Sequence, residues 1–369
     1  GLGFNVLATE TTNSHNTAIG YSSMSSTELS AKNVAVGSNT LQNVTHGSST
    51  DTYNTAVGYN AGISVTSGVR NTLIGGLAGD ALTQGHYNTA VGMFALSSED
   101  AHGYNTAIGY GTLELQNAGT DAYNTALGYI AGQSITTGAS NVLLGSQAGD
   151  ALTTGSHNVA IGRGALGGED AHGRNVAVGH EALNAQDAGA NATNVAMGYE
   201  AGHDVSTGKW NTIIGGNAGD ALTTGDNNII IGYNAAASAV DVDNEITLGN
   251  SDISAFRCAD QSIAALSDGR DKSNVEESPY GLEFINKLKP VKFTWDFRPE
   301  HMSDVKQGKS RVGFIAQDLQ EAMPNNDNDI LDLVYEISED RLEAKYGNLI
   351  PVMAKAIQEL SAEVKELKK

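Results

Sequence analysis

The sequence predicts a mainly β fold, in which a trimeric parallel β-solenoid or β-roll shaft over residues 1–250 precedes a smaller α+β domain ending in a coiled-coil helix. The first observation is a pentapeptide, Asn-(Thr/Val)-apolar-apolar-Gly, that recurs throughout the first 250 residues. The second is a change of composition, because all five prolines lie after residue 278 and only five of the 44 glycines lie after residue 250. Short fixed periods are typical of solenoids, whose coils stack to bury their apolar residues.

The repeat asparagines lie mostly 17 residues apart, with some intervals of 19 and 21 residues. They are Asn16, Asn33, Asn54, Asn71, Asn88, Asn105, Asn124, Asn141, Asn158, Asn175, Asn194, Asn211 and Asn228, and a degenerate copy begins at Asn244. Near-copies begin at Asn54, Asn124 and Asn194, 70 residues apart, so a unit of four coils has been duplicated. Stacked at ~4.8 Å each, the coils predict a rod of about 65 Å.

Each pentapeptide predicts a three-residue strand between two corners, because Asn and Gly tolerate left-handed backbone angles. The outer two strand residues point to one side and the middle one to the other, and they are Thr or apolar residues throughout. Both faces of the strands are therefore expected to become buried. A rod with two such faces is a poor monomer, and we expect a homotrimer.

The charge balance excludes several classes of partner. With 21 Lys+Arg against 42 Asp+Glu, the 369-residue chain has a net charge of −21, so we expect no nucleic acid and no anionic membrane surface as partner. No apolar run reaches the ~18 residues of a spanning helix, so no membrane insertion is expected. The single cysteine, Cys258, excludes an intrachain disulfide framework.

Two recurring polar motifs in the shaft resemble metal sites at first sight. AGDALTTG, at 148–155 and 218–225, supplies one Asp per copy, whereas calcium takes six to eight oxygen ligands. SEDAHG at 98–103 and GEDAHG at 168–173 recur as the four-coil unit recurs, so duplication explains them before metal binding does. The sequence therefore predicts neither a metal nor a cofactor.

The repeats carry a family resemblance. The NTAIGYxA pattern over residues 14–250 resembles the head repeats of trimeric bacterial adhesins and of phage tail fibres. That resemblance implies a β-roll from each chain, packed around a threefold axis. The 17-residue period and the 70-residue super-period depart from the adhesin heads.

The C-terminal part carries a second resemblance. The motifs are SDGRDK at 267–272, LKPVKFTW at 288–295, GFIAQDLQ at 313–320 and a terminal helix that begins near Pro351. In this order they resemble the intramolecular chaperone auto-processing domain of phage tail spikes and fibres, a self-cleaving serine peptidase family. We therefore expect a linker over residues 251–266 and this domain over residues 267–369.

The resemblance implies that Ser267 and Lys272 form a catalytic Ser-Lys dyad, with Asp268 and Arg270 in the same segment. A lysine can act as a base only if burial or nearby positive charge lowers its pKa well below ~10.4. Arg270 could supply part of that positive charge. The expected activity is a single self-cleavage, without action on external substrates.

Two bonds remain candidates for the cut. The hydroxyl of Ser267 can reach the carbonyl of Leu266 through a five-membered ring, which favours cleavage of the Leu266–Ser267 bond. The family resemblance points instead to the Ser267–Asp268 bond, whose cleavage requires attack from a neighbouring chain or by another nucleophile.

The last helix has an apolar seam at alternating spacings of three and four residues, which is typical of a coiled coil. The seam residues are Ile350, Met353, Ile357, Leu360, Val364 and Leu367. The alternative is a single amphipathic helix docked on its own domain. The rod and the family resemblance favour three strands in the coil.

Together these features predict a structural tail fibre or tail spike located in the virion and made in the host cytoplasm. Its C-terminal domain is expected to trimerise and fold the shaft and then to release itself. Expected partners are a host cell-surface receptor or glycan and other virion tail proteins. The alternatives are a trimeric bacterial surface adhesin and the non-catalytic part of a polysaccharide-degrading tail spike.

Overall fold

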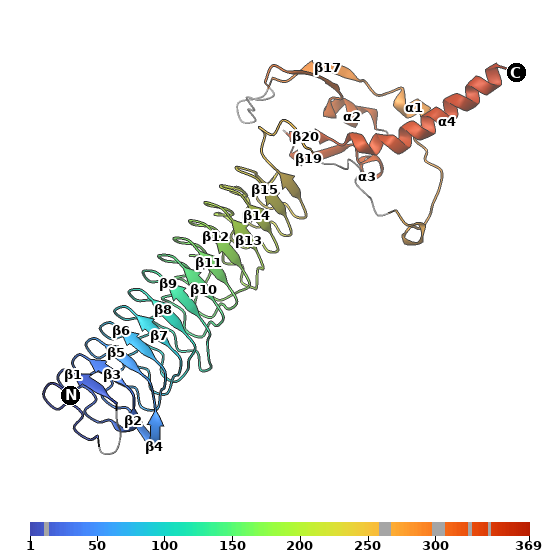
Figure 1. Cartoon of the computed structure of the whole chain (residues 1–369). Helices are drawn as coiled ribbons and strands as arrows, with labels where there is room; N and C mark the ends of the chain where they lie inside the picture. The colour runs from blue at the N-terminus through green and yellow to red at the C-terminus, as the bar shows by residue number, and fades with distance from the viewer. Residues whose placement is uncertain (11–14, 258–266, 297–306, 324–326, 339–340) are drawn as a thin grey trace. The chain divides into compact units, whose positions relative to one another are not determined.

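The computed structural model describes residues 1–10, 15–257, 267–296, 307–323, 327–338 and 341–369. The chain forms two compact units, Gly1–Asn250 and Ser251–Lys369, both drawn in Figure 1. Among the described residues, no helix has the length and apolar character needed to cross a membrane.

The first unit is a parallel β-solenoid with one sheet of 14 strands, stacked in chain order, as Figure 1 shows. The strands are β1 (Thr17–Ile19), β3 (Val34–Val36), β5 (Thr55–Val57), β6 (Thr72–Ile74), β7 (Thr89–Val91), β8 (Thr106–Ile108), β9 (Thr125–Leu127), β10 (Val142–Leu144), β11 (Val159–Ile161), β12 (Val176–Val178), β13 (Val195–Met197), β14 (Thr212–Ile214), β15 (Ile229–Ile231) and β16 (Ile246–Leu248). A separate parallel pair joins β2 (Glu28–Ala31) to β4 (Thr45–Asp51). The predicted solenoid of three-residue strands is confirmed.

The strands pair in register, so equivalent residues of successive coils stack directly. Thr72 pairs with Thr89 and Leu73 with Ala90, for example. The middle residue of a strand points inward, and Leu73 and Ala90 are both fully buried. The flanking residues point outward, and Ile74 stays 37% exposed. Each chain therefore buries one strand face and leaves the other open.

The repeat asparagines form a buried hydrogen-bond ladder inside the shaft. Asn141 accepts the backbone N–H of Asn158 on its Oδ1 atom at 2.9 Å and donates its Nδ2 atom to the carbonyl of Gly155 at 2.9 Å. The left-handed residue is the one before it, Ser140, with φ 60°. The prediction that the repeat asparagines turn the corner through left-handed angles holds for the degenerate copy at Asn244, with φ 61°. It is wrong for the ladder asparagines, whose amide groups bond to the stacked backbone instead.

The corner glycines behave as predicted. Gly162 has φ +132°, and a Cβ atom there would collide with the carbonyl oxygen of Gly179 in the next coil. The turn therefore requires both a backbone angle that L-residues rarely adopt and the close approach of two backbones.

The second unit is a small α+β domain with short elements. They are the 3₁₀ turn η1 (Gly269–Asp271), α1 (Leu282–Ile285), β17 (Val291–Thr294), β18 (Ser310–Gly313), α2 (Ala316–Ala322), α3 (Asn328–Leu331), β19 (Val334–Ser338), β20 (Arg341–Ala344), the 3₁₀ turn η4 (Tyr346–Asn348) and α4 (Leu349–Leu367). β17 pairs with β18, and β19 with β20, both antiparallel. The predicted α+β domain with a terminal helix is confirmed.

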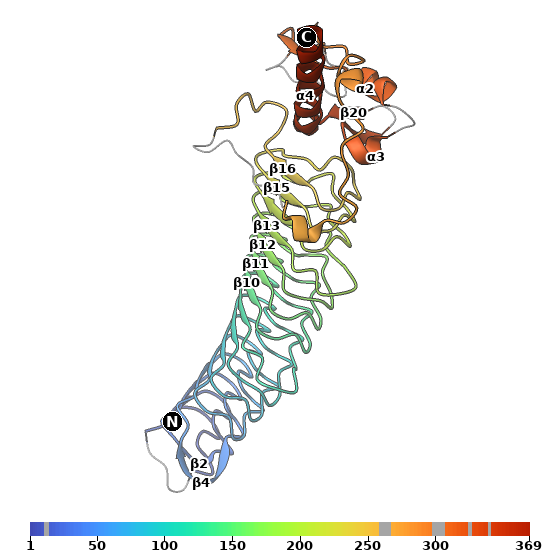
Figure 2. The same cartoon turned by 90° about the vertical axis from the view of Figure 1, so that its right-hand side faces the viewer.

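The core of the second unit gathers side chains from distant parts of its sequence. It contains Tyr280, Phe284, Leu319, Met323, Leu331, Leu333, Val334, Leu349 and Val352. α4 contributes the last two of these and contacts α1, and Figure 1 labels both helices. Figure 2 shows α4 from a second viewpoint. Its remaining length carries mostly exposed residues.

Candidate self-cleavage site and assembly surfaces

A tight turn brings the predicted dyad together. Asp268 caps η1 by accepting the backbone N–H of Arg270 on Oδ1 at 2.9 Å. One turn later the Nζ atom of Lys272 donates a hydrogen bond to the Oγ atom of Ser267 at 2.6 Å. Two residues five positions apart in the sequence therefore meet without help from any other element.

Arg270 is engaged by Asp268. Its Nε atom donates to Oδ1 of Asp268 at 3.0 Å, and its Nη2 atom forms an ion pair with Oδ2. This hydrogen bond from Arg270 lowers the pKa of the Asp268 carboxyl below its usual value. The positive charge of Arg270 is thus directed to Asp268, and its predicted action on Lys272 stays a prediction.

The segment is open to solvent within one chain. All six residues from 267 to 272 are exposed. A lysine becomes a general base only when burial or neighbouring positive charge favours its neutral form. The described residues of one chain therefore bring Lys272 and Ser267 into contact but do not bury them.

The two candidate bonds differ in what the structure describes. Leu266 lies outside the described residues, as does Cys258. Ser267 and Asp268 lie inside them. Both bonds remain candidates on chemical grounds.

Helix α4 has two apolar faces. One packs on its own domain through Leu349, Val352 and Ala356, which are buried. The predicted seam forms the other, and its exposed fractions are Ile350 64%, Met353 44%, Ile357 67%, Leu360 48%, Val364 40% and Leu367 87%. Docking of the helix on its own domain, named above as the alternative to a coiled coil, is therefore present, but it uses a different face from the predicted seam.

Polar contacts fix the docked face of α4. The Oε2 atom of Glu359 accepts the backbone N–H of Leu282 at the start of α1, at 2.7 Å. Lys355 forms an ion pair with Glu277 at 2.9 Å. These contacts, together with the buried residues, fix the docked face of α4 against its own domain.

An apolar hollow of about 450 Å³ opens beside the helix. Its lining includes Ile285, Pro290, Val312, Phe314, Tyr346 and Met353. Met353 also belongs to the seam, so the hollow and the seam form one continuous apolar surface.

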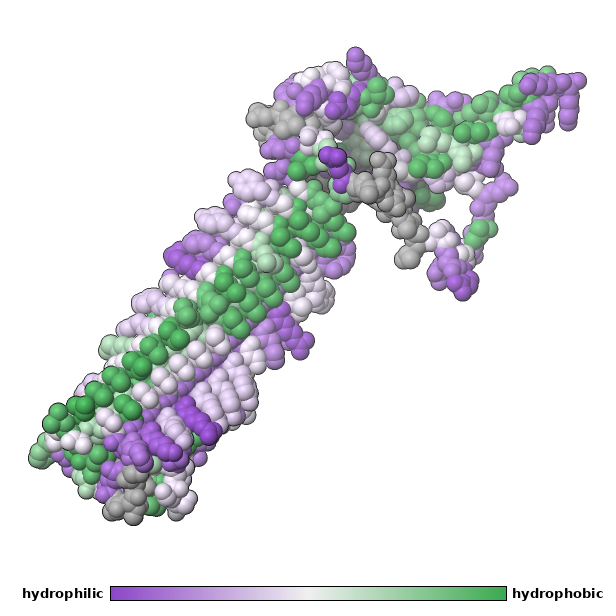
Figure 3. Space-filling model, viewed as in Figure 1, coloured by the Kyte–Doolittle hydropathy of each residue, from purple (hydrophilic) through white to green (hydrophobic). Residues whose placement is uncertain are grey.

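The open strand face of the shaft is a second apolar surface. Figure 3 shows it as a green band along the strands. Its exposed large residues include Ile19, Val34, Ile74, Leu127, Met197, Ile214, Ile229, Ile231, Ile246 and Leu248. Exposed apolar bands of this length mark interaction sites on soluble proteins.

Comparison with known proteins identifies the C-terminal segment. Residues 267–328 match the family described as chaperone of endosialidase, and the match begins at Ser267 of the predicted dyad. No curated protein and no solved structure gives a significant match to the chain. The matched family comes from phage tail proteins, which suggests a location in the virion tail. In the sequence, a parallel β-solenoid of about 14 turns is followed by a chaperone-of-endosialidase segment. This order fits a tail spike or tail fibre with a C-terminal chaperone domain.

Proposed function

We propose that the chain is a structural tail fibre or spike protein whose C-terminal domain trimerises and folds the shaft and then releases itself by Ser-Lys autoproteolysis. The observation that carries this proposal is the 2.6 Å hydrogen bond from Lys272 to Ser267 at the first residue of the family match. The shaft that remains would serve attachment to a host surface through a receptor or glycan.

Two open apolar surfaces support a homotrimer. The α4 seam and the strand face of the shaft are both exposed in one chain, and burying them against two further copies would stabilise the assembly by roughly 25 cal/mol for each Å² removed from water. The exposed seam residues have the spacing of a coiled coil. Copies of the same chain fit these two surfaces, because the seam and the strand face of each copy have the same length and the same spacing of apolar residues.

The chaperone role follows from the degeneracy of the shaft. Identical coils bury nearly the same surface when one chain slips by a whole coil against another, so register among chains is weakly specified. Long-range parallel pairing is also slow to form. A C-terminal trimer would align the three chain ends before the shafts zip together.

The cleavage step couples to assembly through desolvation. In the trimer a neighbouring chain would cover the exposed segment, so that Lys272 can take the proton of the Ser267 hydroxyl. The Oγ atom attacks the scissile carbonyl, and the leaving amine receives the proton. Water then hydrolyses the ester, and the shaft loses its route back to the unassembled state.

The test is the intact mass of the purified chain under denaturing conditions. The parent should give two fragments, whereas Ser267→Ala and Lys272→Gln should give one full-length chain. Fragments that end at residue 266 or at residue 267 differ by one serine, which identifies the bond. Lys292→Gln, at an exposed lysine on β17, is the matched control and should cleave normally. A single species in the parent under trimeric conditions would overturn autoproteolysis.

The chaperone role needs a separate measurement. Refolding of the shaft with and without residues 268–369 should give trimer only when they are present. Equal yields would contradict the folding role even if cleavage occurs.

A further inference from the structure

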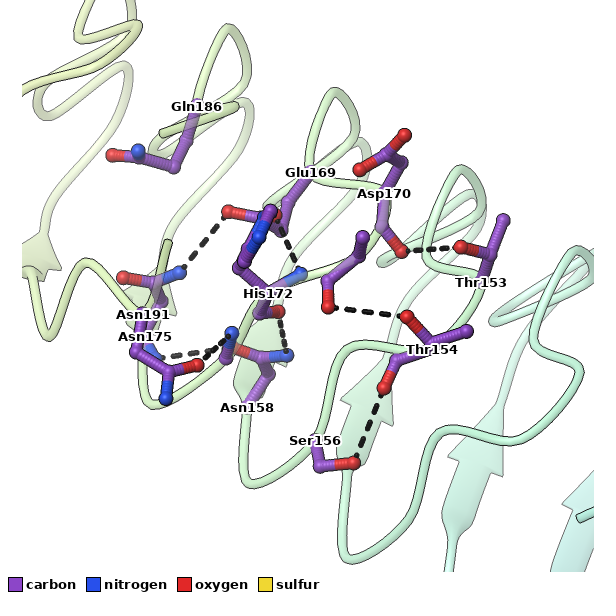
Figure 4. A network of polar contacts seen from close by, with 12 residues as sticks. Thr153, Thr154, Ser156, Asn158, Glu169, Asp170, His172, Asn175, Gln186 and Asn191 are labelled. Atoms are coloured by element: carbon purple, nitrogen blue, oxygen red, sulfur yellow. Dashed lines mark hydrogen bonds and ion pairs between the residues drawn. The ribbon is translucent and has the colours of Figure 1, made fainter. Parts of the chain in front are cut away.

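Two buried glutamates lie at equivalent corners of the shaft, 70 residues apart. Glu99 and Glu169 are both fully buried. Each is followed three residues later by a histidine whose backbone N–H donates to Oε1, at 3.1 Å for His102 and 3.0 Å for His172. Figure 4 shows Glu169 and His172 facing one another.

A structural role explains the side-chain length at this position but not its charge. The Nδ2 atom of Asn175 lies 3.5 Å from Oε2 of Glu169, which is its hydrogen-bond acceptor. A side chain as long as glutamate is needed to reach Asn175. One coil after Glu99, the neutral side chain of Gln116 supplies the same kind of acceptor. Its Oε1 atom accepts a hydrogen bond from Nδ2 of Asn124 at 2.7 Å. The asparagine ladder can therefore be completed by glutamine.

Three polar atoms at these corners lack a hydrogen bond. Within the described part of the chain, Oε2 of Glu99 and the Nδ1 atoms of His102 and His172 are buried without a hydrogen bond.

The separation of the two groups suits a shared cation. The Nδ1 and Oε1 atoms lie 3.5 Å apart in both copies. A charged hydrogen bond would be about 2.7–2.9 Å long. Two ligands at about 2.0–2.1 Å from a tetrahedral zinc ion lie about 3.3 Å from each other.

Further carboxylates complete one copy of the site. Ligand atoms of Glu169, Asp170, His172 and Asp187 all lie within 4.8 Å of one another. Asp187 comes from the next coil, which stacking places beside residue 169. The other copy brings Glu99, Asp100 and His102 together. There Asn117 stands at the position equivalent to Asp187.

We propose that Glu169, Asp170, His172 and Asp187 bind a divalent transition-metal cation of the zinc class, and that Glu99, Asp100 and His102 form a weaker copy of this site. A histidine nitrogen among oxygens favours zinc and its neighbours over calcium and magnesium. Bound between two coils, the ion would cross-link the shaft and raise its resistance to unfolding.

The test is a zinc titration of the full chain by calorimetry, with metal content measured after dialysis. Two ions should bind per chain, one more tightly than the other. Asp187→Asn should weaken the tighter site by at least about tenfold, and Asn117→Asp should strengthen the weaker one. Cobalt should give the intense absorption bands of a four-coordinate ion at the tighter site.

The controls separate metal binding from folding. Glu169→Gln keeps the size of the side chain and removes its charge, so it should abolish the tighter site while the metal-free variant keeps the circular dichroism spectrum of the folded parent. His157→Gln, at an exposed histidine of the same shaft, should bind zinc like the parent. The proposal is overturned if dialysed protein retains no zinc, or if Asp187→Asn and Glu169→Gln bind it as tightly as the parent.

Discussion

The shaft and the C-terminal unit bury different kinds of groups. Among the described residues, every buried polar or charged side chain lies in the shaft, where the ladder runs from Asn33 to Asn228. The second unit buries an apolar core drawn from Tyr280 to Val352. The shaft therefore fixes how residues align within each coil through hydrogen bonds, whereas the C-terminal unit depends on apolar packing.

The two units therefore differ in how well they specify register between chains. A hydrogen-bond ladder rejects a slip of one residue, because every amide would lose its partner. It does not reject a slip of one whole coil, because the next coil offers the same groups. The C-terminal unit has no such repeat, so in the proposed function it would align the chains and define where their coils begin.

The largest effect is expected from a corner glycine of the shaft. Gly162→Ala places a methyl group against the backbone of Gly179, which neighbouring coils hold in place. We expect a loss of at least about 3 kcal/mol in the free energy of unfolding. Thermal unfolding followed by circular dichroism measures it.

The matched control is Gly189→Ala. Gly189 has φ +62°, and no atom lies within 4 Å of the position of a Cβ. Only backbone strain remains, so the loss should be about 1 kcal/mol. Equal losses in the two variants would show that stacking is not what requires glycine at the corners.

The second largest effect tests the ladder. Asn141→Ala leaves the backbone N–H of Asn158 and the carbonyl of Gly155 without their partners inside the shaft. The expected loss is about 2–4 kcal/mol. Asn348→Ala, which removes an exposed contact to the carbonyl of Asp332, should cost less than about 1 kcal/mol. Hydrogen exchange at residues 141–158 measures the local effect, and unchanged protection there would contradict the role given to the ladder.

The strands of the main sheet were predictable from sequence, because its periodicity shows which positions repeat, whereas the separate pair of β2 and β4 was not predicted. Except for β16, which begins two residues after Asn244, the strands of the 14-stranded sheet begin one residue after the asparagine, as at Thr72, and end before the glycine. Periodicity does not show which atoms meet between coils. The role of Asn141 as a ladder member and the approach of Asp187 to Glu169 both depend on contacts between stacked coils.

The C-terminal unit was predictable mainly through its motifs. The pairing of Ser267 with Lys272 is present as the resemblance implied. The ion pair between Asp268 and Arg270 was not predicted, because opposite charges two residues apart meet only in a suitable turn. Likewise, the buried side of α4 depends on the distant α1, which no local spacing reveals.

A smaller effect separates the two faces of α4. Val352→Ala removes apolar contact within the C-terminal core and should cost about 1–2 kcal/mol there. Ile357→Ala, on the exposed seam, should leave that stability within about 0.5 kcal/mol and weaken association instead. Hydrogen exchange in α1 and sedimentation of the full chain measure the two effects. If Ile357→Ala unfolds the domain without changing association, the seam is part of the single-chain fold.

The smallest effect concerns the AGDALTTG corners of the shaft. Burial raises the pKa of the Asp150 carboxyl above its usual value, so the native state binds its proton more tightly than the unfolded state does. Stability from this group is therefore present at low pH and is lost as the pH rises through the folded-state pKa. Asp150→Asn should raise the melting temperature slightly at pH 7, and the difference should vanish on acidification. Asp220→Asn, at the exposed copy of the same corner, should change nothing. An equal rise in both variants would mean that reducing the net negative charge of the shaft, rather than relieving a buried carboxylate, stabilises it.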